Sequence, residues 1–195
     1  MDHFYGEIEG WCDYEDIYRM AIDTASNGAV FVEIGAWKGK SAAYAGVEII
    51  NSGKDITLHL VDHFKGSDEH RNVGSVWYES RLTEDPEWLY NTCVKNTEPV
   101  SGVVKIIRKT SAQAAKGFKA NSVDFVFIDG SHDYDSVCVD IEIWLPKVKP
   151  GGMIGGHDYT THETVREAVD TYFSDLQIIG KSWLYISRSE ENGKD

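Results

Sequence analysis

The segment that decides the fold is AVFVEIGAWKGKS, residues 29–41. It begins with a short apolar run rich in β-branched and aromatic residues, as expected for a strand buried in a parallel sheet. A turn containing Gly35 and Gly39 follows, and a helix is predicted over residues 41–50. The order of strand, glycine turn and helix predicts a βα unit whose turn can approach a ligand closely.

Strands and helices alternate along the rest of the chain. Further strands are predicted at residues 56–61, 103–107, 123–128, 153–156, 176–179 and 183–187. Further helices are predicted at residues 14–25, 87–96, 111–118, 137–148 and 165–173. Pro146 should end the fourth of these early, and Gly151 with Gly152 should form the next turn. This alternation predicts a doubly wound, Rossmann-like α/β fold with a mostly parallel sheet and helices on both faces.

One domain over residues 1–195 fits this length. The polar segment 63–86 lacks a steady period, so we expect a lid or substrate loop there. Trp77 and Tyr78 lie in this segment and could cap a substrate ring, and Trp11 could close over the same edge. The polar end at 189–195 is expected to fray.

Composition narrows the class of protein. The 19 basic and 32 acidic residues give a net charge of −13, which argues against nucleic acid as a partner. Three cysteines without a C-x-x-C pair indicate neither a disulfide framework nor a thiolate zinc site. No secretory leader or apolar membrane span is visible, so a cytoplasmic protein that does not insert into a membrane is expected. A homo-oligomer stays open.

Acidic and metal-binding side chains stand at the carboxyl ends of four predicted strands. Glu33, Asp62 and Asp129 each end or follow a strand, and His157 with Asp158 follows another. In a parallel sheet these ends lie along one edge, where ligands bind. A carboxylate placed like Asp62 can accept both hydroxyls of a ribose, so the pattern favours a nucleoside ligand.

The first turn disfavours a dinucleotide. The dinucleotide fingerprint reads G-x-G-x-x-G, whereas Ala36 and Trp37 break that pattern here. The bulky Trp37 side chain would also crowd a pyrophosphate. An NAD(P)- or nucleotide-dependent enzyme on the same fold is kept as an alternative.

A second group of residues has side chains suited to metal binding and proton transfer. Asp129, His157 and Asp158 offer oxygen and nitrogen ligands suited to Mg²⁺ or Mn²⁺. His132 could take a proton from a hydroxyl as general base, with a pKa expected near neutrality. Whether a metal binds stays open, because the same side chains could cap a helix or pack under the lid. The two-histidine, one-carboxylate triad of non-haem iron enzymes is a minor alternative.

Several motifs together carry a family resemblance. Residues 32–41, Val61 with Asp62, VDFVFIDGSHDY (123–134), KPGG (149–152) and GHD (156–158) resemble class I S-adenosylmethionine-dependent methyltransferases. More narrowly, the chain resembles the small O-methyltransferases that include the macrolide sugar enzymes, over roughly residues 10–159. The resemblance implies seven strands, the last one antiparallel, with S-adenosylmethionine along the edge of the sheet.

The resemblance also implies which residues bind the cofactor. These are Glu33, Gly35, Ala36, Gly39, Ser41, Asp62, His63, Ser111, Ala112 and Asp129. Glu33 would anchor the methionine part, Asp62 would hold the ribose, and Ser111 with Ala112 would meet the adenine.

The reaction implied is methyl transfer to a hydroxyl of a small molecule of sugar or natural-product type. His132 and Asp129 would be the catalytic residues. His157 stands where many relatives carry an acid, which leaves metal dependence open. A non-catalytic regulatory protein that binds the same cofactor is a further alternative.

Overall fold

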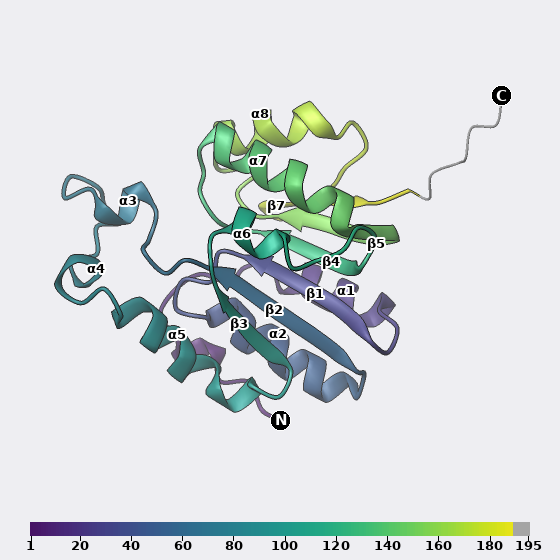
Figure 1. Cartoon of the computed structure of the whole chain (residues 1–195), viewed down its shortest axis with the longest axis horizontal. Coiled ribbons are helices and arrows are strands. Elements are labelled where there is room, and N and C mark those ends of the chain that lie inside the picture. The colour runs from purple at the N-terminus through teal and green to yellow at the C-terminus, as the bar shows by residue number, and fades with distance from the viewer. Residues whose placement is uncertain (189–195) are drawn as a thin grey trace.

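Seven strands form one sheet, and the computed structural model describes residues 1–188 of the chain (Figure 1). The strands are β1 (Ala29–Ile34), β2 (Ile56–Asp62), β3 (Val104–Arg108), β4 (Val123–Ile128), β5 (Val148–Gly156), β6 (Gln177–Ile179) and β7 (Ser182–Ile186). Their order is β3-β2-β1-β4-β5-β7-β6. The pairs from β3 to β5 are parallel, and β7 is antiparallel to both β5 and β6. The predicted fold is confirmed; the frayed end expected at 189–195 lies outside the described residues.

Helices cover both faces of this sheet. They are η1 (Tyr5–Glu7), α1 (Glu15–Thr24), α2 (Lys40–Ser52), α3 (Asp68–Arg71), α4 (Arg81–Glu84), α5 (Trp88–Thr97), η2 (Glu98–Val100), α6 (Ser111–Ala115), α7 (Tyr134–Trp144), η3 (Leu145–Lys147) and α8 (Glu163–Tyr172). One core cluster packs α1, α2 and α5 against the sheet, and a second packs α6, α7 and α8 against its other face (Figure 1). None of these helices is long and apolar enough to cross a membrane.

Strand β1 shows how the sequence builds two cores. Phe31 packs into the first cluster, whereas Val32 and Ile34 pack into the second. Successive side chains of a strand point to opposite faces, and here both faces are covered by helices. The strand is therefore apolar on both faces instead of alternating, with Glu33 as its one polar residue.

The prediction of a turn at Gly151 and Gly152 is wrong, because both residues lie inside β5. The Gly151 N–H donates to Ser187 O at 2.7 Å, and the Ser187 N–H donates to Gly152 O at 2.8 Å. The register between β4 and β5 shifts here, and Gly151 has a positive φ of 79°. The two glycines thus form an irregularity of the β-bulge kind within β5, and the strand continues on both sides of it.

The lid predicted at residues 63–86 contains two short helices, α3 and α4. Each has four residues, too few for a hydrophobic period to show in the sequence. The Glu79 N–H donates to His70 O at 2.9 Å, and this hydrogen bond connects the end of α3 to the residues just before α4. In Figure 1 this segment projects beyond the carboxyl ends of the parallel strands. The helix after β4 ends at Trp144, before Pro146, as predicted.

Candidate active site

Two cavities meet at the carboxyl ends of β1 and β4. The larger, about 550 Å³, extends from the turn after β1 past the end of β2 to the starts of α6 and α7. The smaller, about 310 Å³, lies among the N-terminal segment, the turn after β1 and the turns after β4 and β5. Both are lined by Gly35, Trp37, His70, Asp129 and Gly130. A ligand in one cavity can therefore reach a ligand in the other at this shared wall.

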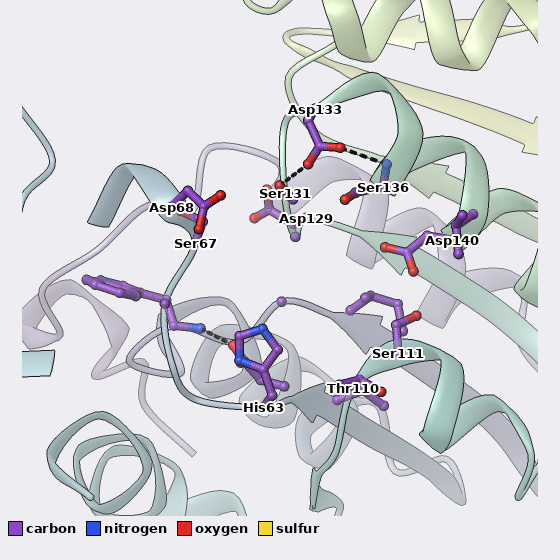
Figure 2. Close-up of a pocket in the computed structure, with 18 of the residues that line it drawn as sticks. His63, Ser67, Asp68, Thr110, Ser111, Asp129, Ser131, Asp133, Ser136 and Asp140 are labelled. Atoms are coloured by element: carbon purple, nitrogen blue, oxygen red, sulfur yellow. Dashed lines mark hydrogen bonds and ion pairs between the residues drawn. The ribbon is translucent and has the colours of Figure 1, made fainter. Parts of the chain in front are cut away.

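The structure brings most of the expected cofactor residues to these cavities. The larger cavity is lined by Gly35, Asp62, His63, Ser111, Ala112 and Asp129. Figure 2 labels three of them, His63, Ser111 and Asp129. The smaller one is lined by Gly35, Ala36, Ser41 and Asp129. Glu33 and Gly39 line neither of them.

Glu33 lies behind the turn, not in it. Its side chain is fully buried and accepts hydrogen bonds from the hydroxyls of Tyr18 and Ser41. Burial raises the pKa of Glu33 to about 8, against the effect of these two hydrogen bonds. Glu33 therefore joins α1, β1 and α2 as a buried, largely neutral group near pH 7.

Asp62 shapes the turn from the end of β2. Its Oδ2 accepts hydrogen bonds from the backbone N–H groups of Ala36 at 2.9 Å and Trp37 at 3.3 Å. Its Oδ1 accepts from the N–H of Phe64 at 2.6 Å. A carboxylate has about four lone-pair positions, so capacity is left for a ligand in the larger cavity.

Gly35 allows the two strand ends to touch. Its φ is +93°, and a Cβ at this position would lie 2.0 Å from the carbonyl oxygen of Asp129. No side chain larger than hydrogen fits without moving the end of β4. The shared wall of the two cavities thus depends on this glycine.

The three residues expected to bind a metal lie together beside the smaller cavity. Donor atoms of Asp129, His157 and Asp158 all fall within 4.8 Å of one another. His157 Nδ1 is 3.2 Å from Asp158 Oδ2 and 3.7 Å from Asp129 Oδ1. Two carboxylates and one imidazole form a donor set that fits a divalent ion such as Mn²⁺.

His132 reaches the same group, but with a different pKa from the one expected. Its Nε2 is 3.0 Å from Asp158 Oδ2, and its Nδ1 is 3.5 Å from Glu69 Oε1. Burial alone would lower the pKa of His132, but the hydrogen bond to Asp158 and the surrounding carboxylates raise it to about 9. The expected near-neutral value is wrong for this reason. Conversely, hydrogen bonds from His132 and His157 outweigh burial and hold the pKa of Asp158 well below its ordinary range.

Two residues at this site, Asp13 and Tyr14, are not evident from the sequence. The Tyr14 hydroxyl donates to Asp129 Oδ2 at 2.8 Å, and Asp13 Oδ1 lies 2.7 Å from His157 Nε2 without hydrogen-bond geometry. Both come from the segment before α1. The only available signal was the position of Tyr14 on the apolar face of the predicted helix.

A two-histidine, one-carboxylate group also exists, formed by Glu69, His132 and His162. The rings of His132 and His162 stack at 4.1 Å with an angle of 26°. The lone pair of an imidazole nitrogen lies in the ring plane, so stacked rings direct these lone pairs side by side instead of toward one ion. This arrangement disfavours a metal at Glu69, His132 and His162. The non-haem iron alternative concerns two histidines and a carboxylate among Asp129, His132, His157 and Asp158, and it stays an alternative.

Aromatic side chains form the outer wall of the smaller cavity. Trp37 stacks on His70 with a centroid distance of 4.1 Å. Trp11 meets Trp77 of the lid edge to face at 5.2 Å. Segment 63–86 and the N-terminal segment therefore flank the cavity with flat, largely apolar surfaces, whereas Tyr78 does not line it.

Comparisons with known proteins place this chain in a family. Residues 32–159 match the model of a methyltransferase domain. Among curated proteins, the uncharacterized protein y4gI of Sinorhizobium fredii is 30% identical over 77 residues, which are 40% of this chain and 8% of that protein. The chain thus spans a small part of that relative.

Solved structures show the same fold at low identity. The O-methyltransferase NovP has a TM-score of 0.63 at 16% identity, covering 90% of this chain and 79% of its own. Cofactor-bound Rv0187 from MTB gives 0.60 at 12% identity, covering 93% and 83%. The S-adenosylmethionine-dependent O-methyltransferase TM0748 of Thermotoga maritima gives 0.57 at 13% identity, covering 92% and 66%. The resemblance to class I S-adenosylmethionine-dependent methyltransferases is confirmed, and the chain belongs to the methyltransferase-domain family.

Proposed function

We propose that this protein transfers a methyl group from S-adenosylmethionine to a hydroxyl of a small molecule, assisted by a divalent ion. The observation that carries the proposal is the junction of the two cavities at Gly35 and Asp129. The larger cavity has the features of a nucleoside site. The smaller one joins aromatic walls to a cluster of carboxylates and imidazoles.

The larger cavity suits the methyl donor by shape and charge. Asp62 stands where a ribose would be held, and Ser111 lies at the far end where a base would fit. The acids that line this cavity are Asp62, Asp68, Asp129, Asp133, Asp135 and Asp140. These acids outnumber the two cationic residues of the lining, Arg71 and Lys109, and a negative lining favours a ligand that carries a sulfonium cation.

The acceptor would lie in the smaller cavity. Asp129, His157 and Asp158 would hold a divalent ion, which lowers the pKa of a bound hydroxyl and orients it when present. The hydroxyl oxygen forms a bond to the methyl carbon, and the carbon–sulfur bond breaks with its electron pair going to sulfur. The hydroxyl proton passes to the fraction of His132 that is neutral, which grows as the pH approaches the pKa of about 9, and the Asp158 carboxylate stabilises the imidazolium that forms.

Two observations support the proposed class of acceptor. NovP and TM0748 are O-methyltransferases, and their folds resemble this one. The faces of Trp11, Trp37 and Trp77 can stack on a sugar or an aromatic ring. We therefore propose a hydroxylated sugar or a related natural product as the acceptor, with no role for nucleic acid or membranes.

The test is methyl transfer from S-adenosylmethionine labelled in its methyl group. Purified protein is incubated with Mn²⁺ and a panel of hydroxylated sugars and phenols, with the matching amines as controls. Transfer to a hydroxyl that is lost in His132→Ala, with unchanged cofactor affinity, is the expected result. Transfer only to amines would contradict the proposed hydroxyl acceptor. Tight cofactor binding without any transfer would favour the regulatory alternative.

A further inference from the structure

The two ring nitrogens of His157 have different surroundings. Nδ1 lies 3.2 Å from Asp158 Oδ2 and 3.7 Å from Asp129 Oδ1, so it faces the other two candidate metal ligands. Nε2, on the other side of the ring, lies 2.7 Å from Asp13 Oδ1. A divalent ion at this cluster would take the lone pair of Nδ1, and the ring proton would then be on Nε2.

That proton on Nε2 needs an acceptor. The nitrogen is buried and has no aligned hydrogen-bond partner among residues 1–188. A buried N–H group without an acceptor costs free energy, and such groups are rarely left unpaired in folded proteins. Asp13 Oδ1 is already within hydrogen-bond distance, so only the orientation of this carboxylate has to change.

Asp13 is held through its other oxygen. Lys181 Nζ donates to Asp13 Oδ2 at 2.5 Å, and the backbone N–H of Tyr159 donates to Lys181 O at 2.8 Å. Burial alone would raise the pKa of Asp13, but its interactions with Lys181 and His157 lower it. Asp13 is therefore a charged carboxylate whose Oδ1 is left for His157.

We propose that Asp13 is a positioning residue for the metal site: its Oδ1 accepts the Nε2–H of His157 and so directs the Nδ1 lone pair toward the ion. This inference rests on the proposed function, in which Asp129, His157 and Asp158 hold a divalent ion. A carboxylate in this place fixes the tautomer and orientation of a metal-binding imidazole and raises its basicity. The N-terminal segment thereby contributes to metal affinity without touching the ion.

The experiment measures the affinity for Mn²⁺ by calorimetry. Asp13→Ala should bind Mn²⁺ about tenfold more weakly than the wild type, at the lower end of the usual range of about 10- to 100-fold, because the Asp13 side chain is 44% exposed. Its affinity for S-adenosylhomocysteine should stay within about twofold, since Asp13 does not line the larger cavity. An unchanged Mn²⁺ affinity in Asp13→Ala overturns the positioning role.

Lys181→Met is the matched control. It breaks the same ion pair as Asp13→Ala but keeps the carboxylate beside His157. It should bind Mn²⁺ at least as tightly as the wild type, because it removes a positive charge near the ion. A loss as large as that of Asp13→Ala would assign the effect to the ion pair between the N-terminal segment and the turn from β6 to β7, and would overturn the inference.

A double-mutant cycle tests the link to the imidazole. The variant His157→Glu has no ring N–H, so adding Asp13→Ala to it should change Mn²⁺ affinity by less than about twofold or should increase it. The same tenfold loss in both backgrounds would mean that Asp13 acts without His157, which contradicts the inference.

The outcomes also separate this inference from the function beneath it. Mn²⁺ binding by the wild type that Asp13→Ala leaves unchanged overturns the inference alone. No Mn²⁺ binding by folded wild type overturns both the inference and the metal assistance in the proposed function. Circular dichroism checks that Asp13→Ala is folded. If it is not, Asp13→Asn replaces it: a neutral acceptor should cost at least about threefold in Mn²⁺ affinity, and no loss overturns the role of Asp13.

Discussion

The hydroxyl of Tyr14 donates a 2.8 Å hydrogen bond to Asp129, a residue 115 positions away in the sequence. Tyr14 is buried immediately before α1, and its ring lies 4.9 Å from that of His157. The segment before the first strand is therefore part of the candidate active site. It orients a carboxylate that lines both cavities.

Removing this hydroxyl should weaken the metal site. Groups that orient metal ligands typically contribute about 10- to 100-fold to metal affinity, so Tyr14→Phe should lower Mn²⁺ affinity by at least about tenfold. Calorimetric titration with MnCl₂ measures the change. Tyr172→Phe, which loses a hydroxyl bonded to the distant Glu142, is the control and should match the wild type. Equal Mn²⁺ affinity in Tyr14→Phe would contradict the orienting role.

Glu33→Gln should keep cofactor binding, because Glu33 touches neither cavity and the amide mimics the neutral acid. S-adenosylhomocysteine affinity should stay within about twofold of the wild type, given that no ligand contact is removed. A tenfold loss in the folded variant would place Glu33 in contact with the ligand, as the resemblance implied.

The same variant gives a pH test of stability. The pKa of Glu33 is about 8 in the folded protein, above the roughly 4.3 of an unfolded glutamate. The folded state then holds the proton more tightly, so the wild type loses stability as pH rises through this window. Glu33→Gln should lack that loss. Thermal unfolding of both proteins at pH 5 and pH 9 measures it, and parallel pH dependences would refute the buried neutral acid.

Two glycines with similar backbones should respond differently to alanine. Gly28 has φ +81° and open space where a Cβ would go, whereas at Gly35 the Cβ would overlap the Asp129 carbonyl. Gly28→Ala should cost about 1–2 kcal/mol from backbone strain alone. Gly35→Ala should cost at least about 3 kcal/mol or prevent folding, because overpacking adds to the strain. Urea unfolding compares the two, and equal losses would show that the close approach of β1 and β4 is not needed.

The imidazole of His157 should determine whether the site prefers Mn²⁺ or Mg²⁺. An imidazole suits Mn²⁺ better than Mg²⁺, which prefers oxygen ligands alone. Wild-type protein should therefore bind Mn²⁺ more tightly, and His157→Glu should shift the preference toward Mg²⁺. Calorimetry with both ions on both proteins measures the shift. An unchanged ratio of affinities would mean that His157 does not bind the ion.

Local patterns were enough to predict the fold. The apolar run of β1, the glycine turn and the alternation of strands and helices depend on residues close in sequence. The acids at the strand ends could be placed along one edge because parallel strands must end there. The short helices α3 and α4 and the irregularity at Gly151 could not be predicted, since each depends on contacts with other segments.

The candidate site was only partly predictable for the same reason. The pKa of His132 is set by Asp158, which follows a different strand, and the position of Asp129 is fixed by Tyr14. Long-range contacts of this kind do not appear in a single sequence.

The measurement that tests the central claim most directly is calorimetric titration of the protein with S-adenosylhomocysteine, with NAD as the control ligand. The account predicts binding of one ligand per chain with a Kd of about micromolar order, and no binding of NAD. It also predicts a separate binding response to Mn²⁺ that Asp158→Asn abolishes. Absence of S-adenosylhomocysteine binding by folded protein would contradict the assignment of the larger cavity to the methyl donor.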